Sequence, residues 1–73
     1  MSAAHFGRLV RELREAAGWS QEQLAEHADL NRSYVGEIER GRAVPSIFTA
    51  EKIAAAFKVP LSSLLARCER MAA

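Results

Sequence analysis

Residues 20–46 read SQEQLAEHADLNRSYVGEIERGRAVPS, and this stretch decides the fold because it encodes two short helices and the turn between them. Ser20 and the glutamine three residues later form a capping box, which closes the first turn of a helix. The box predicts a helix over about residues 21–28. Asn31 is a second N-cap residue, and it predicts another short helix that runs to Arg40 and stops at a glycine.

Helical periodicity continues on both sides of this stretch. Before it, apolar residues recur every three or four positions and stop at Gly18, which predicts a helix over roughly residues 3–17. The stripe of that helix consists of Phe6, Leu9, Val10, Leu13, Ala16 and Ala17. After the stretch, Ser46 is an N-cap residue, and Pro60 separates two further helices. Their expected buried stripes are Ile47, Ala50, Ile53, Ala54 and Phe57, then Leu61, Leu64, Leu65, Cys68 and Met71. The sequence contains no strand pattern, so we expect an all-α fold of five short helices.

The helix expected after Asn31 has a polar outer side. Val35 and Ile38 recur at the spacing of a buried stripe. The residues expected on the outward and flanking sides are Arg32, Ser33, Gly36, Glu37 and Arg40, with Tyr34 at an edge. A glycine inside a helix costs about 1 kcal/mol relative to alanine. Gly36 therefore indicates either the close approach of another molecule or simple tolerance, and the residue alone does not decide between the two.

Two charged residues fall on the buried stripes. Glu39 lies four residues after Val35 and so turns toward the interior, where a carboxylate needs a cationic partner. Arg14 lies four residues after Val10, at the edge of the stripe of the first helix. The spacing predicts an ion pair between Arg14 and Glu39 that ties the first helix to the third. The alternative is that both are ordinary surface charges.

Composition restricts the class of protein. The 73 residues include ten basic and nine acidic side chains, and the net charge of +1 does not by itself indicate nucleic-acid binding. Eight of the ten basic residues are arginine, which suits contacts with phosphate and guanine but is equally explained by codon composition. A single cysteine excludes an internal disulfide framework, and no Cys/His spacing indicates zinc. Without a secretory leader or a long apolar run, we expect a soluble, cytoplasmic protein with no cofactor, metal, membrane or small-molecule partner.

Candidate reactive side chains do not form a catalytic pattern. His5, His27 and Cys68 fall on three different expected helices, and no motif surrounds any of them. We interpret Cys68 as a small apolar residue of the core or of a seam between subunits. We therefore expect that the protein is not an enzyme.

The quoted stretch, preceded by LREAAGW and followed by VPLSSLL, resembles the helix-turn-helix domain of the phage repressor and Cro family. The similarity covers about residues 6–66. It implies a compact five-helix bundle of the lambda-repressor-like type, with one domain over 1–73. The helix-turn-helix would occupy about 20–40, and helices over about 46–70 would supply core and dimer seam. The family has a buried arginine–glutamate pair at these positions, but often a glycine where this chain has Asp29, a residue that tolerates the left-handed conformation.

The resemblance also implies which residues contact DNA. The helix after Asn31 would be the recognition helix, which lies in the major groove. The implied base contacts are Arg32, Ser33, Tyr34 and Glu37, and the implied backbone contacts are Gln21, Arg40, Arg42 and Ser46. Arginine can donate two hydrogen bonds to guanine, and glutamate can accept one from cytosine or orient Arg32. For Tyr34 the alternative is packing on its own fold, and for Arg40 and Arg42 it is solvated charge.

An apolar patch is expected on the last two helices. Phe48 and Ala55 lie off the buried stripe, at positions that are usually polar in the family. Together with Leu61, Leu65 and Cys68 they would form a surface through which two copies associate. The alternative is that the last helix folds back over the patch.

These features predict a sequence-specific DNA-binding transcriptional regulator, an activator or a repressor, that binds a palindromic double-stranded operator as a homodimer. The segment NRSYVGEIERG resembles the recognition segment of the controller proteins of restriction-modification systems. A Cro-like phage repressor and an antitoxin-type protein-interaction module are the remaining interpretations.

Overall fold

The computed structural model describes residues 2–72, and the all-α fold expected from the sequence is confirmed. The five helices are α1 (Ala3–Ala16), α2 (Gln21–Ala28), α3 (Arg32–Glu39), α4 (Ile47–Ala56) and α5 (Leu61–Ala72). Helices α1 and α3 each end one residue earlier than the sequence predicts. No strand occurs between residues 2 and 72.

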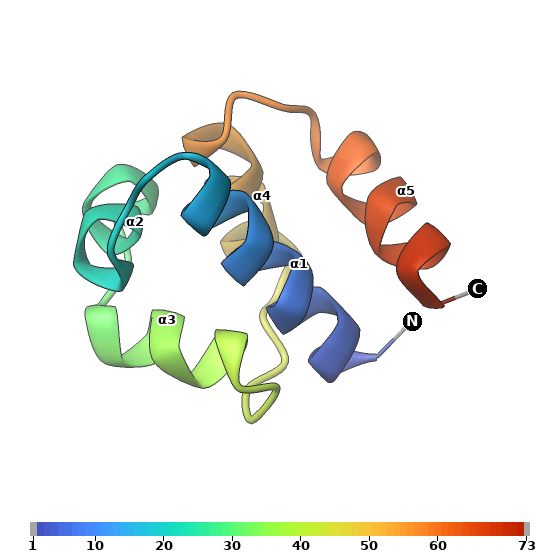
Figure 1. Cartoon of the computed structure of the whole chain (residues 1–73), viewed down its shortest axis with the longest axis horizontal. Helices are drawn as coiled ribbons and strands as arrows, with labels where there is room; N and C mark the ends of the chain where they lie inside the picture. The colour runs from blue at the N-terminus through green and yellow to red at the C-terminus, as the bar shows by residue number, and fades with distance from the viewer. Residues whose placement is uncertain (1, 73) are drawn as a thin grey trace.

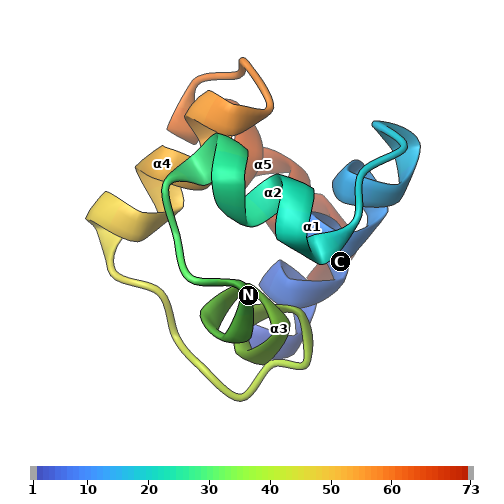
Figure 2. The same ribbon diagram turned by 90° about the vertical axis from the view of Figure 1, so that its left-hand side faces the viewer.

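Helix α1 runs through the centre of the molecule, between α3 on one side and α5 on the other (Figure 1). Helix α2 packs on α3 and α4, and α4 also contacts α5. Figure 2 shows α2 crossing above α3, with α4 beside α2. The fully buried side chains between these helices include Val10, Leu24, Val35, Ile38, Ile53, Leu64 and Cys68. The core therefore draws on every helix.

The caps expected from the sequence determine where α2 and α3 begin. The Ser20 side chain accepts a hydrogen bond from the backbone N–H of Gln23, and the Gln23 side chain accepts one from the backbone N–H of Ser20. The Asn31 side chain accepts a hydrogen bond from the Ser33 backbone at 2.7 Å. Asp29 adopts the left-handed conformation, with φ 54° and ψ 51°, and ends α2. The turn thus forms without the glycine that the family often has there.

Two expectations about the buried stripes are wrong. Ile47, expected to point inward, is 61% exposed, because it is the first residue of α4 and the buried stripe of that helix begins one turn later, at Ala50. Ala16 and Ala17 are exposed as well, since they form the end of α1. The buried side chains of α1, Phe6, Leu9 and Val10, all lie before its last turn.

Gly7 lets α1 approach α3 more closely than any other residue would. A Cβ atom added at Gly7 would overlap the backbone carbonyl oxygen of Ile38 and would lie 2.8 Å from that of Glu39. Backbone atoms cannot move aside as a flexible side chain can. Gly7 was not predicted from the sequence to make this contact, although an isolated glycine within a helical pattern often has a packing reason.

We predict that Gly7→Ala lowers the free energy of unfolding by roughly 1–3 kcal/mol, because the added methyl group forces the two helices apart. Urea denaturation monitored by circular dichroism measures the change. Gly36→Ala is the matched control. A Cβ atom there would meet only the flexible end of Arg40, at 3.2 Å, so this substitution should leave stability unchanged or raise it. Equal stability of the two variants would contradict the role of Gly7 as the point of close contact between α1 and α3.

Candidate nucleic-acid interface

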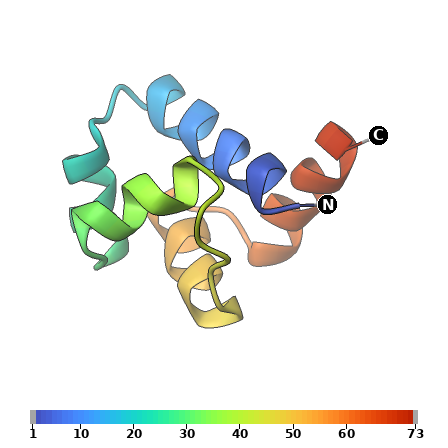
Figure 3. The ribbon, with the colours of Figure 1, turned by 90° about the horizontal axis from the view of Figure 1, so that it is seen from below.

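The outer face of α3 is not covered by another helix. Figure 3 views the molecule from below and shows α3 in front of the rest of the bundle. Val35 and Ile38 anchor its inner face and are fully buried, whereas Arg32 and Ser33 at its N-terminal end are exposed. Helix α3 therefore presents its first turn to solvent and its apolar stripe to the core.

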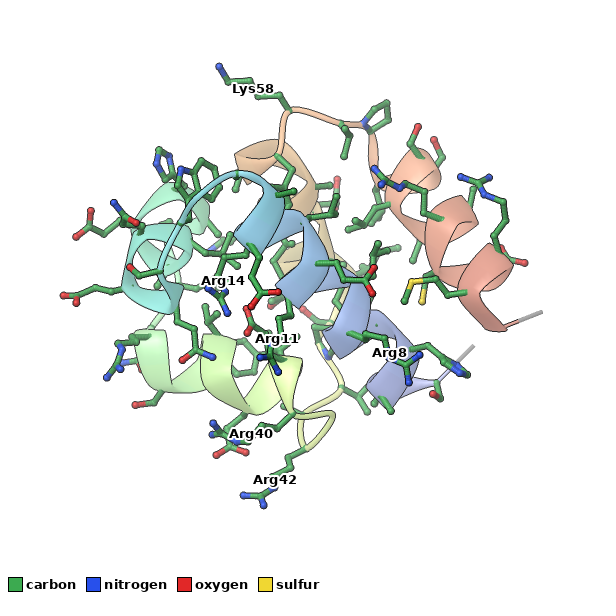
Figure 4. The ribbon with its side chains drawn as sticks, viewed as in Figure 1. Arg8, Arg11, Arg14, Arg40, Arg42 and Lys58 are labelled. Carbon is green, nitrogen blue, oxygen red and sulfur yellow. The ribbon has the colours of Figure 1, made fainter. Side chains whose placement is uncertain are left out.

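The ion pair expected between Arg14 and Glu39 is present. Arg14 donates from Nε to Glu39 Oε2 at 2.7 Å and from Nη2 to Oε1 at 3.1 Å. The two side chains are only 12% and 3% exposed. Arg14 Nη1 also donates to the backbone carbonyl of Trp19 at 2.8 Å. The hydrogen bonds to Glu39 raise the pKa of Arg14. The charged guanidinium, labelled in Figure 4, joins α1, α3 and the loop before α2.

Gln21 supports this pair instead of keeping its whole side chain for DNA. Its Nε2 donates to Glu39 Oε1 at 3.1 Å, so one of the two N–H groups of the side-chain amide is used inside the protein. The bond holds the first residue of α2 next to α3. The Gln23 backbone N–H is taken by the Ser20 cap, and the N–H groups of Gln21 and Glu22 belong to the first turn, where a helix leaves them without an intrahelical acceptor and an anion can bind.

A polar hollow of about 260 Å³ lies between the start of α2 and the outer face of α3. It brings together many of the residues implied as DNA contacts. The residues that line it are Gln21, Arg32, Ser33, Gly36, Glu37 and Arg40. The site is thus a continuous polar surface that spans both helices of the helix-turn-helix.

The other implied DNA contacts lie outside the hollow. Tyr34 is partly buried and packs against the core, which agrees with the alternative of packing on its own fold. Arg42 is exposed in the loop after α3 and points away from the bundle in Figure 4. Ser46 is exposed and caps α4, where its oxygen accepts a hydrogen bond from the Thr49 backbone at 3.2 Å.

Two features of the site were not expected from the sequence. Gly36 is buried, because the Arg40 guanidinium lies over it, so the close approach at this glycine is made by a side chain of the same helix. Arg40 also forms a salt bridge with Glu37, at 3.1 Å between Nη2 and Oε1. The three-residue spacing of Glu37 and Arg40 was the available signal.

An aromatic stack covers the side of the bundle next to α2. The rings of Trp19 and His27 lie 4.1 Å apart and nearly parallel, at 11°, and Trp19 also stacks on Phe57 at 5.5 Å. The stack fixes the loop before α2 against α4. None of the helices that the structure describes is long and apolar enough to span a membrane.

Comparison with known proteins agrees with this geometry. A family model described as helix-turn-helix matches residues 10–64, which is most of the chain. The chain belongs to this helix-turn-helix family. The resemblance inferred from the sequence is therefore confirmed.

Several members of the helix-turn-helix family are similar to this chain. Control protein C.BamHI of Bacillus amyloliquefaciens is 43% identical over 61 residues, which cover 82% of this chain and 75% of that protein. The immunity repressor protein of Bacillus phage phi105 is 39% identical over 59 residues, which cover 81% of this chain but only 41% of the repressor.

Solved structures of the family superpose closely on this fold. The restriction-modification controller protein C.AhdI from Aeromonas hydrophila is 44% identical with a TM-score of 0.81, covering 85% of this chain and 94% of that one. The biofilm regulator SinR, solved in complex with DNA, is 36% identical with a TM-score of 0.76, covering 82% and 97%.

We predict that Arg14→Met and Glu39→Gln each lower the free energy of unfolding by about 3 kcal/mol, since each leaves a buried charge without its partner. In a double-mutant cycle the two changes should couple by at least about 1 kcal/mol. The matched control is the mostly exposed pair of Arg11 and Glu15, at 3.4 Å, which should couple by no more than about 0.5 kcal/mol. Equal coupling in both cycles would show that the inner pair has no special role.

Proposed function

We propose that residues 1–73 act as one DNA-binding domain of a sequence-specific transcriptional regulator that places α3 in the major groove of its operator. One observation carries the proposal. The buried pair of Arg14 and Glu39 fixes the inner side of α3, while Arg32 and Ser33 stay exposed at its N-terminal end. This is the arrangement in which a recognition helix reaches base edges with its first residues.

The roles of the remaining residues follow from their places around α3. Arg32 and Ser33 read base edges, and the exposed part of Tyr34 adds contacts beside them. Phosphates bind at the start of α2, next to Gln21, and at Arg42 and Ser46 on the far side of α3. Glu37 and Arg40 also face the groove, as a base contact and a backbone contact in the family pattern. In this chain they are bonded to one another, so their roles are coupled.

We propose further that the regulator is a homodimer. Phe48 is 74% exposed at the start of α4, and Ala55 lies two turns later on the same side of that helix and is exposed too. Next to the start of α4 is an apolar groove of about 360 Å³, lined in part by Leu61 and Leu65. Exposed apolar side chains and an apolar groove at the start of the same helix support association through this part of the molecule. Cys68 does not belong to the patch, because it is fully buried in the core of one subunit.

Two-fold symmetry links the dimer to the operator. Each α3 would read one half-site, and the half-sites of a palindromic operator lie one helical turn, about 34 Å, apart. Two linked half-sites also compensate for the few contacts that a single domain of this size can make.

Among regulators, the controller of a restriction-modification system is the narrower role that we propose. The chain spans 75% of C.BamHI and 94% of C.AhdI, whereas it spans only 41% of the phage repressor. The similarity to controllers therefore extends over most of their length. An antitoxin-type module is less well supported, because the hollow at the outer face of α3 is polar and lined by Arg32 and Arg40.

We predict that selection from random DNA yields a palindromic site. Arg32→Ala should weaken binding to that site by about tenfold or more while leaving binding to random DNA nearly unchanged, because a guanine contact contributes about 1–3 kcal/mol. Gel-shift titration measures both affinities. Arg42→Ala is the matched control and should weaken both complexes alike. The slope of log affinity against log salt concentration should fall by about one, because one phosphate contact is lost. Failure to select any sequence would contradict the proposed function, and equal losses for Arg32→Ala would contradict base reading.

We predict that Phe48→Asp converts the dimer to a monomer, since it replaces an exposed aromatic ring of the proposed interface with a charge. Sedimentation velocity gives the mass, and circular dichroism checks that the helices remain. Glu26→Ala, an exposed change on α2 and outside the proposed interface, should leave the dimer intact. A dimer that survives Phe48→Asp would place the interface elsewhere.

A further inference from the structure

Arg40 carries its guanidinium to the middle of α3, although its backbone lies at the end of that helix. The residue is the C-cap of α3, and side chains of a helix lean toward its N-terminus. A Cβ atom added at Gly36 would lie 3.2 Å from Nη1 and 3.3 Å from Nη2 of Arg40. The guanidinium therefore lies one helical turn back, in the space that the missing side chain of Gly36 leaves.

Glu37 holds the guanidinium in this place. The salt bridge joins side chains that are 50% and 43% exposed, so it adds little to the stability of the fold. Its effect is on orientation. The bond to Glu37 Oε1 engages one N–H of Nη2, whereas a guanidinium has five N–H donors in a rigid plane. Enough donors remain for a pair of parallel hydrogen bonds to an outside acceptor.

The neighbours of the guanidinium are the expected base readers. Arg40 lines the same polar hollow as Arg32 and Ser33, which occupy the first turn of α3. Arg42, the next basic residue along the chain, is not part of that hollow. Arg40 thus lies with the residues that face base edges, and apart from the loop arginine that faces a phosphate in the proposed complex.

We propose that Arg40 is a specificity-determining residue that donates two hydrogen bonds to a guanine in the major groove, with Glu37 as its positioning residue and Gly36 as its platform. Guanine is the base whose O6 and N7 match the paired N–H groups of an arginine. This inference rests on the proposed function. It replaces the backbone contact expected for Arg40 and the independent base contact expected for Glu37, and it explains why a glycine is present in the middle of α3.

The test compares binding to the selected operator with binding to a set in which each base pair of the half-site is changed singly. Arg40→Lys keeps the charge but loses the planar fork, so discrimination should fall by about tenfold or more at one base pair and stay unchanged at the others. Glu37→Gln and Gly36→Ala should reduce discrimination at that same base pair, because each releases or displaces the guanidinium. Arg42→Lys is the control and should leave the whole profile unchanged.

The unfolding temperature and the base-pair profiles separate this role of Arg40 from simpler ones. Gly36→Ala should unfold at the same or a higher temperature than the wild-type protein, so its loss of discrimination cannot come from unfolding. A profile for Arg40→Lys that matches the wild type at every base pair would overturn the proposal and return Arg40 to a phosphate contact. Loss at different base pairs for Glu37→Gln and Arg40→Lys would overturn it too, since Glu37 would then read its own base.

Failure of the proposed function has a different signature. In that case the wild-type protein selects no sequence, and both proposals fall. If the wild type selects a site and Arg32→Ala loses it selectively while Arg40→Lys does not, only the role of Arg40 is wrong.

Discussion

The buried ion pair between Arg14 and Glu39 is the interaction on which the geometry of the interface depends. A charge pair that leaves water is stabilising only when its remaining donors and acceptors are satisfied. Here the guanidinium also reaches the Trp19 carbonyl, and the carboxylate also accepts from Gln21. Among the described residues that are not themselves exposed, no buried side-chain nitrogen or oxygen lacks a partner. Three helices are thereby fixed relative to one another, including the one that faces DNA in the proposed complex.

Close backbone contact completes what the ion pair begins. Gly7 lies two helical turns before Arg14 on α1, and both residues meet the last turn of α3. Gly41 adds a second close approach: its φ is +74°, and a Cβ atom there would lie 3.0 Å from the Cα atom of Ala4. The distance between α1 and α3 is thus set by backbone atoms in contact, which cannot move aside, and by the hydrogen-bonded ion pair of Arg14 and Glu39. These contacts hold α3 rigidly in a small bundle that has no large core.

Local signals in the sequence suffice for the helices but not for all of the site. Caps such as Ser20 and Asn31 act within one helical turn, so their effect can be predicted from neighbouring residues. The partners Arg14 and Glu39 could be matched because each falls on a buried stripe. Other outcomes depend on distant parts of the chain and could not be predicted in this way. They are the exposure of Ile47 at the edge of the bundle, the carbonyl opposite Gly7, and the Glu39 side chain within reach of Gln21. Periodicity predicts which face of a helix is buried, but it does not predict which residues pack against that face.

The two glutamates of α3 illustrate how little net charge such an interface needs. Glu39 faces inward to Arg14 and Glu37 outward to Arg40, so each carboxylate is matched by an arginine before DNA arrives. With a net charge of only +1 on the whole chain, long-range attraction to the phosphate backbone is weaker than for a strongly basic domain. In the proposed complex, affinity therefore has to come from directed hydrogen bonds at base edges and from joining two half-sites in a dimer. Weak attraction to random DNA is an advantage for a regulator, because the many competing sites of a genome then hold fewer of its copies.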